Sequence, residues 1–350
     1  MKTEKISISN NEKIAFVSNF ATMLAAGISI LEVVDSLMED AKGNQKKLLQ
    51  TLRDDLIQGN HVYTSFARFP LVFDKVTVNI IKASEQAGSL AVTLKDLKDN
   101  IQKEIEFNDK VKSALMYPIM IFIVFALVML MILIVVVPKI ATVFLRMRVT
   151  LPLPTRVLIY VSNLLLNHTV PLLAGVAAFI AVFVFLYRSQ KRRLFNILFS
   201  LPLVSELIKE IDLTRLTRSM GLLLGAGIPI TSTLELAQEV VMRRDVAKLM
   251  ADTYTMVLSG KRISEGLKAK KGVIPSIVIK IVEAGEKTGT LDKSMQDISE
   301  YLDYQVSNTL RTLTAMLEPL MLVIVGVLIG GMMLAIIAPI YGLIGQVGGR

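Results

Sequence analysis

A long apolar run without a charged side chain constrains this sequence more than any other feature. Residues 113–138 include no Asp, Glu, Lys or Arg, and residues 119–137 read IMIFIVFALVMLMILIVVV. As an α-helix this run would extend roughly 30 Å, which is the thickness of the hydrocarbon core of a bilayer. Two further runs, 169–187 and 319–340, are also free of charge. The sequence therefore predicts three membrane-spanning helices, with a buried helix of a soluble protein as the alternative for each.

The composition supports membrane insertion and excludes several other classes of protein. Of the 350 residues, 53% are hydrophobic and 20% are charged, and none is cysteine. This apolar content is too high for a disordered chain, and a disulfide scaffold or thiol chemistry would need cysteine. The first 30 residues do not read as a secretory signal, because Asn19 interrupts their apolar stretch.

Basic residues beside the second run indicate which side of the membrane each segment occupies. Residues 188–193 carry four basic side chains, and no acidic residue comes before Glu206. Because basic residues collect on the cytoplasmic side, this end of the second span is predicted to be cytoplasmic. The segment 139–168 also carries four basic residues and no acidic one, so charge alone leaves the orientation open.

Matching segments about 200 residues apart organise the chain. The pairs are 24–30 with 224–230, 83–90 with 284–291, and Tyr117-Pro118 with Glu318-Pro319. An internal repeat of this length indicates two homologous domains. Each domain is predicted to lead into a membrane helix. The second span, which has no counterpart in the repeat, then returns the chain to the side on which both domains lie.

Within the two domains the local signals are helical. Ser-x-x-Glu patterns, which are typical of helix N-termini, begin at Ser9, Ser29 and Ser232. Gly27 and Gly227 stand where a helix would end in a left-handed residue. No alternating apolar pattern with turn signals predicts a strand. The predicted fold class is an all-α membrane protein with two homologous cytoplasmic helical bundles, of five or six helices each, and three transmembrane helices.

These boundaries predict seven segments. They are a first cytoplasmic domain (1–113), a first span (114–138), an extracytoplasmic loop (139–168), a second span (169–187), a second cytoplasmic domain (188–317), a third span (318–340) and an extracytoplasmic tail (341–350). The arrangement predicts a multi-pass protein of the cytoplasmic membrane, with its N-terminus in the cytoplasm and its C-terminus outside.

The sequence lacks motifs for nucleotide hydrolysis, metal catalysis and ion transport. No Gly-x-x-x-x-Gly-Lys-Ser/Thr phosphate loop occurs, and two histidines without any cysteine form no zinc motif of the usual kinds. The three apolar runs have no charged residue in their interior, whereas proton and ion relays normally need one. We therefore expect no enzyme activity, no cofactor and no metal, with a small-solute transporter as the alternative function.

Glu85 and Glu286 are the most specific polar features, each in a Glu-x-x-Gly-Ser/Thr-Leu segment. In one interpretation Gly88 and Gly289 each end a helix, and the glutamates bind backbone donors or a neighbouring helix. In the other, the two carboxylates contact a partner or share a cation. Glu318 also has two interpretations. Its carboxylate either faces the positive N-terminal end of the helix dipole of the third span, or it contacts a partner.

Several short segments, taken in order, match a known family. They are 113–118 (SALMYP), 137–139 (VPK), 151–156 (LPLPTR), 224–230 (LGAGIPI), 285–291 (GEKTGTL), 317–319 (LEP) and 338–340 (API). They resemble the type II secretion F family, the inner-membrane platform proteins of type II secretion and type IV pilus assembly (the GspF/PilC kind). The resemblance runs from about residue 12 to 345.

That resemblance implies a non-enzymatic platform for the assembly of a pilus or pseudopilus. Such a platform connects a cytoplasmic hexameric ATPase to pilin or pseudopilin subunits that move from the bilayer into the filament. It is expected to form a homo-oligomer and to contact other inner-membrane assembly proteins and the lipid bilayer, but not nucleic acid.

Three basic residues in the second domain form a candidate partner-binding site. Arg243, Arg244 and Lys248 fall close together on one predicted helix, within a segment (188–317) that has 19 basic and 14 acidic residues. They are predicted either to face anionic lipid headgroups or to dock an acidic patch of the expected ATPase.

Overall fold

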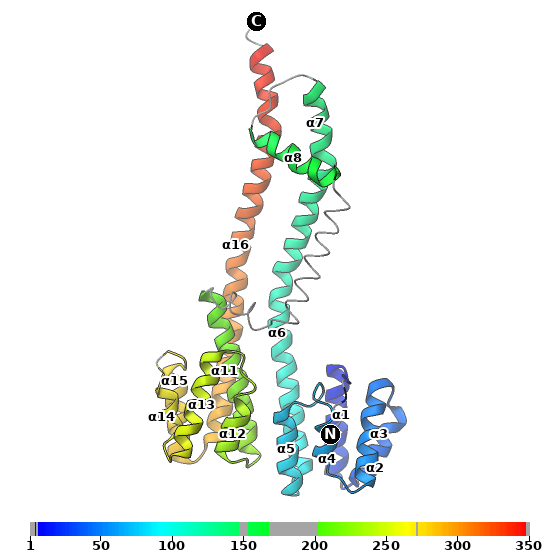
Figure 1. The fold of residues 1–350 in the computed structure, drawn as a ribbon, viewed down its shortest axis with the longest axis vertical. Helices are drawn as coiled ribbons and strands as arrows, with labels where there is room; N and C mark the ends of the chain where they lie inside the picture. Colours follow the sequence, from blue (N-terminus) through cyan, green and yellow to red (C-terminus); the bar gives the residue numbers. More distant parts are fainter. Residues whose placement is uncertain (1–3, 5, 147–152, 168–201, 271, 348–350) are drawn as a thin grey trace. The chain divides into compact units, whose positions relative to one another are not determined.

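The computed structural model describes residues 4, 6–146, 153–167, 202–270 and 272–347, and in this part of the chain the regular structure is helical, without a strand (Figure 1). The all-helical class predicted from the sequence is confirmed for these residues. They fall into two compact units, Met1–Lys110 with Glu206–Asn308, and Val111–Ser205 with Thr309–Arg350. The first unit holds two helical domains, and the second holds the apolar parts of the chain.

The first helical domain is built around a cluster of phenylalanines. Its helices are α1 Asn10–Ala25, α2 Ile30–Asp40, α3 Gly43–Ile57, α4 Val62–Phe66, α5 Lys75–Gln86 and the start of α6 Leu90–Met131. Phe66 and Phe73 stack in the core with ring centroids 4.0 Å apart, and Phe16 packs against both. A capping box begins α1, because the N–H of Ser9 donates to the Glu12 carboxylate (2.7 Å) and the N–H of Glu12 donates to Ser9 Oγ (3.3 Å).

The second helical domain has its helices in the same order. They are α11 Pro202–Gly225, α12 Ile230–Ala237, α13 Arg244–Leu258, α14 Ile263–Lys268, α15 Ser276–Thr288 and the start of α16 Leu291–Val347. Aliphatic and methionine side chains, among them Met220 and Met250, form its core. The predicted cap at Ser232 is wrong, because Pro229 precedes the first residue of α12 and Ser232 lies inside the helix. This proline takes the place of Ser29, whose Oγ caps α2.

A glycine turn of the same geometry ends the first helix of each domain. Gly27 and Gly227 adopt φ of 84° and 77°, a left-handed conformation that glycine enters without strain. The following N–H groups, of Ile28 and Ile228, reach back to carbonyl oxygens five residues earlier, at 3.1 and 3.0 Å. This is the Schellman arrangement, which satisfies carbonyl groups that a helix end otherwise leaves free.

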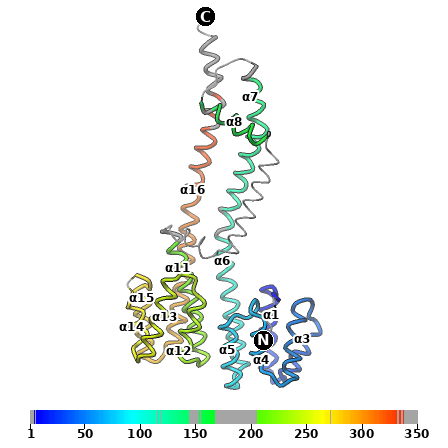
Figure 2. Tube along the Cα trace, viewed as in Figure 1, coloured from blue at the N-terminus to red at the C-terminus, as the bar shows by residue number. Residues whose placement is uncertain are grey.

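Two helices continue from the domains into the second unit (Figure 2). Helix α6, together with the helical turns that follow it, contains the stretch Leu90–Val143, and α16 contains Leu291–Gly331; both stretches are long and apolar enough to cross a membrane. The predicted spans 114–138 and 318–340 fall on these two helices. The predicted span 169–187 and the basic flank 188–193 that follows it lie outside the described residues.

A π-helical turn, η1 Ile132–Val136, separates α6 from α7 Val137–Arg146. The N–H of Val137 donates to the carbonyl oxygen of Ile132, five residues earlier. Pro138 explains the wider turn, since its ring would crowd an ordinary α-helical turn and it has no N–H to donate. The helix therefore continues beyond residue 138, the predicted end of the first span.

The segment predicted as an extracytoplasmic loop, 139–168, is mostly helical where the structure describes it. It contains the end of α7 and a further helix, α8 Leu153–Asn167. Helix α8 packs against η1 and α7 within the second unit (Figure 1). The loop prediction missed this helix, because an apolar helix of 15 residues is too short to register as a span.

Candidate docking surfaces

Glu85 lies at the C-terminal end of α5, and its carboxylate holds the start of α4. The N–H groups of Val62 and Tyr63 donate to its two oxygens at 2.9 and 3.3 Å. His61, the residue before α4, supplies no side-chain cap of its own. A carboxylate here satisfies two donors that the first turn leaves free, and it faces the positive end of the helix dipole.

Glu286 does the same for α14 in the second domain. It accepts hydrogen bonds from the N–H of Ile263 and, at 3.1 Å, from the N–H of Ser264. The side chain of Arg262, the residue before α14, likewise makes no capping hydrogen bond to that helix. Both glutamates thus bind backbone donors of their own domain. Contact of either carboxylate with a partner stays a prediction, and among the described residues no group of three or more His, Cys, Asp or Glu side chains is placed to hold a metal.

The glycines that follow these glutamates have left-handed conformations. Gly88 and Gly289 adopt φ of 69° and 71°, two residues before the first residue of α6 and of α16. The N–H of the next residue, Ser89 or Thr290, donates to a carbonyl oxygen five residues earlier. Each Glu-x-x-Gly segment therefore joins the helix that carries the glutamate to the long helix of its domain.

Glu318 is not at the start of a helix. Helix α16 runs without interruption from Leu291 to Val347, so Glu318 and Pro319 lie in its interior. The predicted interaction of Glu318 with an N-terminal dipole is therefore wrong. Pro118 likewise lies inside α6. An interior proline removes only one backbone hydrogen bond, and a long apolar helix tolerates that loss.

The structure separates the three basic residues of the predicted docking site. Arg243 turns inward and binds Asp245 through Nε (3.0 Å) and Nη2 (2.7 Å), and its side chain is only 18% exposed. The hydrogen bond from Arg243 lowers the pKa of Asp245. Arg244 and Lys248 remain exposed and lie one turn apart on α13. The exposed cationic pair is therefore Arg244 and Lys248.

A buried aspartate fixes the loop before this pair. Oδ2 of Asp212, on α11, accepts hydrogen bonds from the N–H groups of Met242 and Arg243, at 2.9 and 2.6 Å. Burial raises the pKa of Asp212, and the two backbone hydrogen bonds oppose that shift. Asp212 belongs to none of the motifs found in the sequence. Its position next to Leu213, in an apolar stripe that also includes Leu216, could have indicated that this aspartate is buried.

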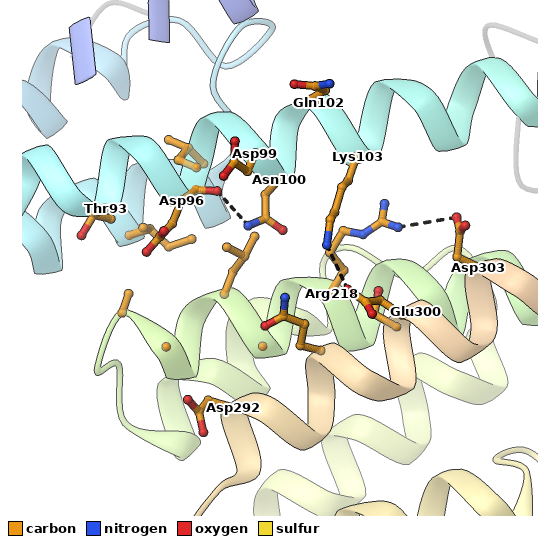
Figure 3. Close-up of a pocket in the computed structure, with 18 of the residues that line it drawn as sticks. Thr93, Asp96, Asp99, Asn100, Gln102, Lys103, Arg218, Asp292, Glu300 and Asp303 are labelled. Carbon is orange, nitrogen blue, oxygen red and sulfur yellow. Dashed lines mark hydrogen bonds and ion pairs between the residues drawn. The ribbon is translucent and has the colours of Figure 1, made fainter. Parts of the chain in front are cut away.

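The first unit also contains a polar cleft that the sequence did not predict. It has a volume of about 770 Å³ and is lined by α6, α11 and α16 (Figure 3). Lys103 pairs with Glu300 at 3.0 Å across it, and Lys110 pairs with Asp303 at 3.0 Å. Arg218 lies over the ring of Phe107, 5.3 Å from its centroid. Burial lowers the pKa of Arg218, and nearby Asp303 opposes that effect.

A small apolar cluster also joins the two helical domains. Val76 and Ile80 of α5 pack with Leu223 and Ile228 from the second domain. Nearby, Lys75 pairs with Glu239 at 2.7 Å. The described contacts between the two domains thus combine a small buried apolar cluster with exposed ion pairs. Exposed ion pairs contribute little to stability, because water competes for both partners.

Comparison with known proteins gives consistent matches over most of the chain. The family model "Type II secretion system (T2SS), protein F" matches residues 16–138 and again residues 216–339. The type IV pilus assembly protein PilC of Thermus thermophilus is 30% identical over 334 residues, covering 94% of this chain and 82% of that protein. PilC of Myxococcus xanthus is 27% identical over 343 residues, covering 97% and 82%. Type II secretion system protein F of Pseudomonas aeruginosa is 27% identical over 328 residues, covering 92% and 80%.

Proposed function

Because this chain belongs to the type II secretion system protein F family, we propose that it is a non-enzymatic platform of the cytoplasmic membrane for pilus or pseudopilus assembly. On this proposal it couples a cytoplasmic hexameric ATPase to the movement of pilin subunits out of the bilayer. The observation that carries the proposal is the continuity of α6 and α16, each of which begins in a helical domain and ends in an apolar stretch that belongs to a segment long enough to cross a membrane.

Continuous helices suit such a role because they transmit displacement. Helix α16 has 57 residues and is roughly 85 Å long at 1.5 Å per residue. A loop between domain and span would absorb movement, since loops are more mobile than helices. A domain displaced by a partner would therefore move the membrane end of its helix as well.

The proposed topology has three spans, with both helical domains in the cytoplasm. Two observations support duplication of the domain: the helices follow in the same order, and the same family model matches twice. Two direct copies, each ending in an outward span, require a returning helix between them. The apolar run 169–187 has the length and composition for that helix.

Pilin or pseudopilin subunits, other inner-membrane assembly proteins and further copies of the chain are the proposed partners in the membrane. The proposed partner in the cytoplasm is the ATPase, and the exposed pair Arg244 and Lys248 offers it a cationic contact. A transporter function gains no support from the two described spans, whose segments 113–138 and 319–340 carry no charged residue.

Insertions of equal length and different stiffness test the coupling. Four alanines or four glycines are inserted after Arg311 in α16, between the second domain and the apolar stretch. Each glycine costs about 1 kcal/mol relative to alanine within a helix. We expect the alanine insertion to retain substantially more filament assembly than the glycine insertion, at equal membrane levels and equal ATPase binding. Equal assembly by the two variants would contradict mechanical coupling through α16.

A further inference from the structure

Helix α8 has an apolar stripe that faces away from the rest of the described protein. Leu153, Val157, Tyr160 and Leu164 recur at spacings of four, three and four residues, which places them on one side of a helix. Their exposed fractions are 76%, 60%, 69% and 42%. A continuous stripe of four large apolar side chains is unusual on a protein surface that is exposed to water.

The two fully buried residues among the described side chains of α8 carry hydroxyl groups, and the apolar residues Leu158 and Ile159 beside them are half-buried. Thr155 and Ser162, two turns apart, are 4% and 1% exposed. A helix on the surface of a soluble domain has the opposite arrangement, with apolar residues inward and polar residues outward. An exposed stripe of large apolar side chains opposite two buried hydroxyl groups indicates that the outer side of α8 meets an apolar medium.

A hydrogen bond fixes α8 to η1, the π-helical turn that follows α6. Ser162 Oγ donates to the carbonyl oxygen of Leu133 at 2.6 Å. In the π-helical register of η1, this carbonyl is the one that an N–H at position 138 would bind, and Pro138 has none. Ser162 thus satisfies a backbone acceptor that lipid could not satisfy.

This hydrogen bond also determines the depth of α8. Leu133 lies within the uncharged run 119–137, where side chains such as Leu130, Met131 and Val135 are exposed in the absence of a bilayer. The surface of that run faces the hydrocarbon of the membrane. Because α8 packs against η1 and α7, its apolar stripe continues the apolar surface of this run.

We propose that α8 is embedded in the membrane and that its stripe, Leu153, Val157, Tyr160 and Leu164, binds the acyl chains of bilayer lipids. Its 15 residues extend roughly 22 Å, too short to cross the hydrocarbon core, so it lies within one leaflet. Arg156 is the one charged residue of α8. A long basic side chain beside an apolar stripe can reach the headgroups while its stem stays in the apolar layer.

The absence of tryptophan from the sequence allows a direct test. Single-tryptophan variants of the full chain are reconstituted in phosphatidylcholine vesicles whose acyl chains are brominated, and fluorescence is compared with that in unbrominated vesicles. Tyr160→Trp reports on the stripe. Phe122→Trp, at a residue 60% exposed in the span, is the lipid control. Tyr304→Trp, at a residue 63% exposed and roughly 21 Å along α16 before Glu318, is the aqueous control.

We expect brominated chains to remove about half or more of the fluorescence of Tyr160→Trp and Phe122→Trp, and little of that of Tyr304→Trp. Acrylamide in the aqueous phase should quench Tyr304→Trp alone. Quenching of Tyr160→Trp by acrylamide and not by bromine would overturn the proposal, because α8 would then lie in water. Resistance to both quenchers would also overturn it, because protein would then cover the stripe. Leu164→Trp, on the same stripe, repeats the measurement if Tyr160→Trp fails to insert.

Discussion

Glu286 holds the first turn of α14 through two backbone hydrogen bonds, as Glu85 holds the first turn of α4. Each carboxylate comes from a helix that begins only after the capped helix has ended, so the bonds also tie two helices together. The same solution in both domains assigns the two glutamates a structural role. That role does not require a partner or a cation.

Replacing either glutamate by alanine should destabilise its domain. Glu85→Ala and Glu286→Ala each leave two N–H groups without an acceptor, which should lower the free energy of unfolding by about 1–3 kcal/mol. Thermal unfolding of the detergent-solubilised protein measures this loss, and the amides of Val62 and Ile263 should exchange hydrogen faster. The exposed residues Glu39 and Glu265 provide matched alanine controls. Weaker ATPase co-purification with unchanged stability would instead favour a docking role.

Charge reversal should distinguish the exposed basic pair from the inward-facing arginine. Arg244→Glu with Lys248→Glu should weaken co-purification of the ATPase, more at low salt than at moderate salt, because such charges act mainly on the rate of encounter. Membrane insertion and stability should not change. Arg243→Ala should instead lower stability, because Asp245 loses its partner. Unaltered ATPase binding by the double variant at both salt concentrations would remove this surface from the proposed interface.

Single cysteines in this cysteine-free chain test the topology. Ser7→Cys and Ser259→Cys change exposed residues of the two helical domains, and Thr150→Cys lies between α7 and α8. A membrane-impermeant maleimide added outside right-side-out vesicles should label only Thr150→Cys. After lysis it should label all three. Labelling of either domain from outside would invert the proposed arrangement.

Gly285 should not tolerate a side chain. A Cβ at this position would lie 2.3 Å from Oγ of Ser294 and 2.8 Å from its Cβ, where α15 packs on α16. Gly285→Ala should therefore cost about 1–3 kcal/mol of stability. Combining it with Ser294→Gly removes both contacting atoms and should recover part of the loss. Ser84, at the matching position of the first domain, is buried, and Ser84→Ala gives the control. Equal stability of Gly285→Ala and wild type would show that the two helices separate easily.

The sequence by itself determined the features that depend on neighbouring residues. Apolar spacing and the Ser9 cap indicated helices, and residues 113–138 indicated a span, because helix formation and transfer into lipid depend on residues within a few turns. The glycines at 27 and 227 marked helix ends for the same local reason. The matches at a spacing of 200 residues also indicated two domains with equivalent helix ends.

Tertiary structure alone decided which distant groups meet. Glu85 reaches a helix that begins 23 residues earlier, Asp212 accepts a hydrogen bond from the N–H of Met242, 30 residues later, and Ser162 binds a carbonyl 29 residues away. None of these contacts repeats with the period of a helix; the Glu-x-x-Gly segments indicated backbone donors for Glu85, but not which helix supplies them. They depend on how helices pack, and packing depends on the shapes of side chains from many parts of the chain at once. For that reason the sequence placed three cations in one patch, whereas the structure left Arg244 and Lys248 exposed.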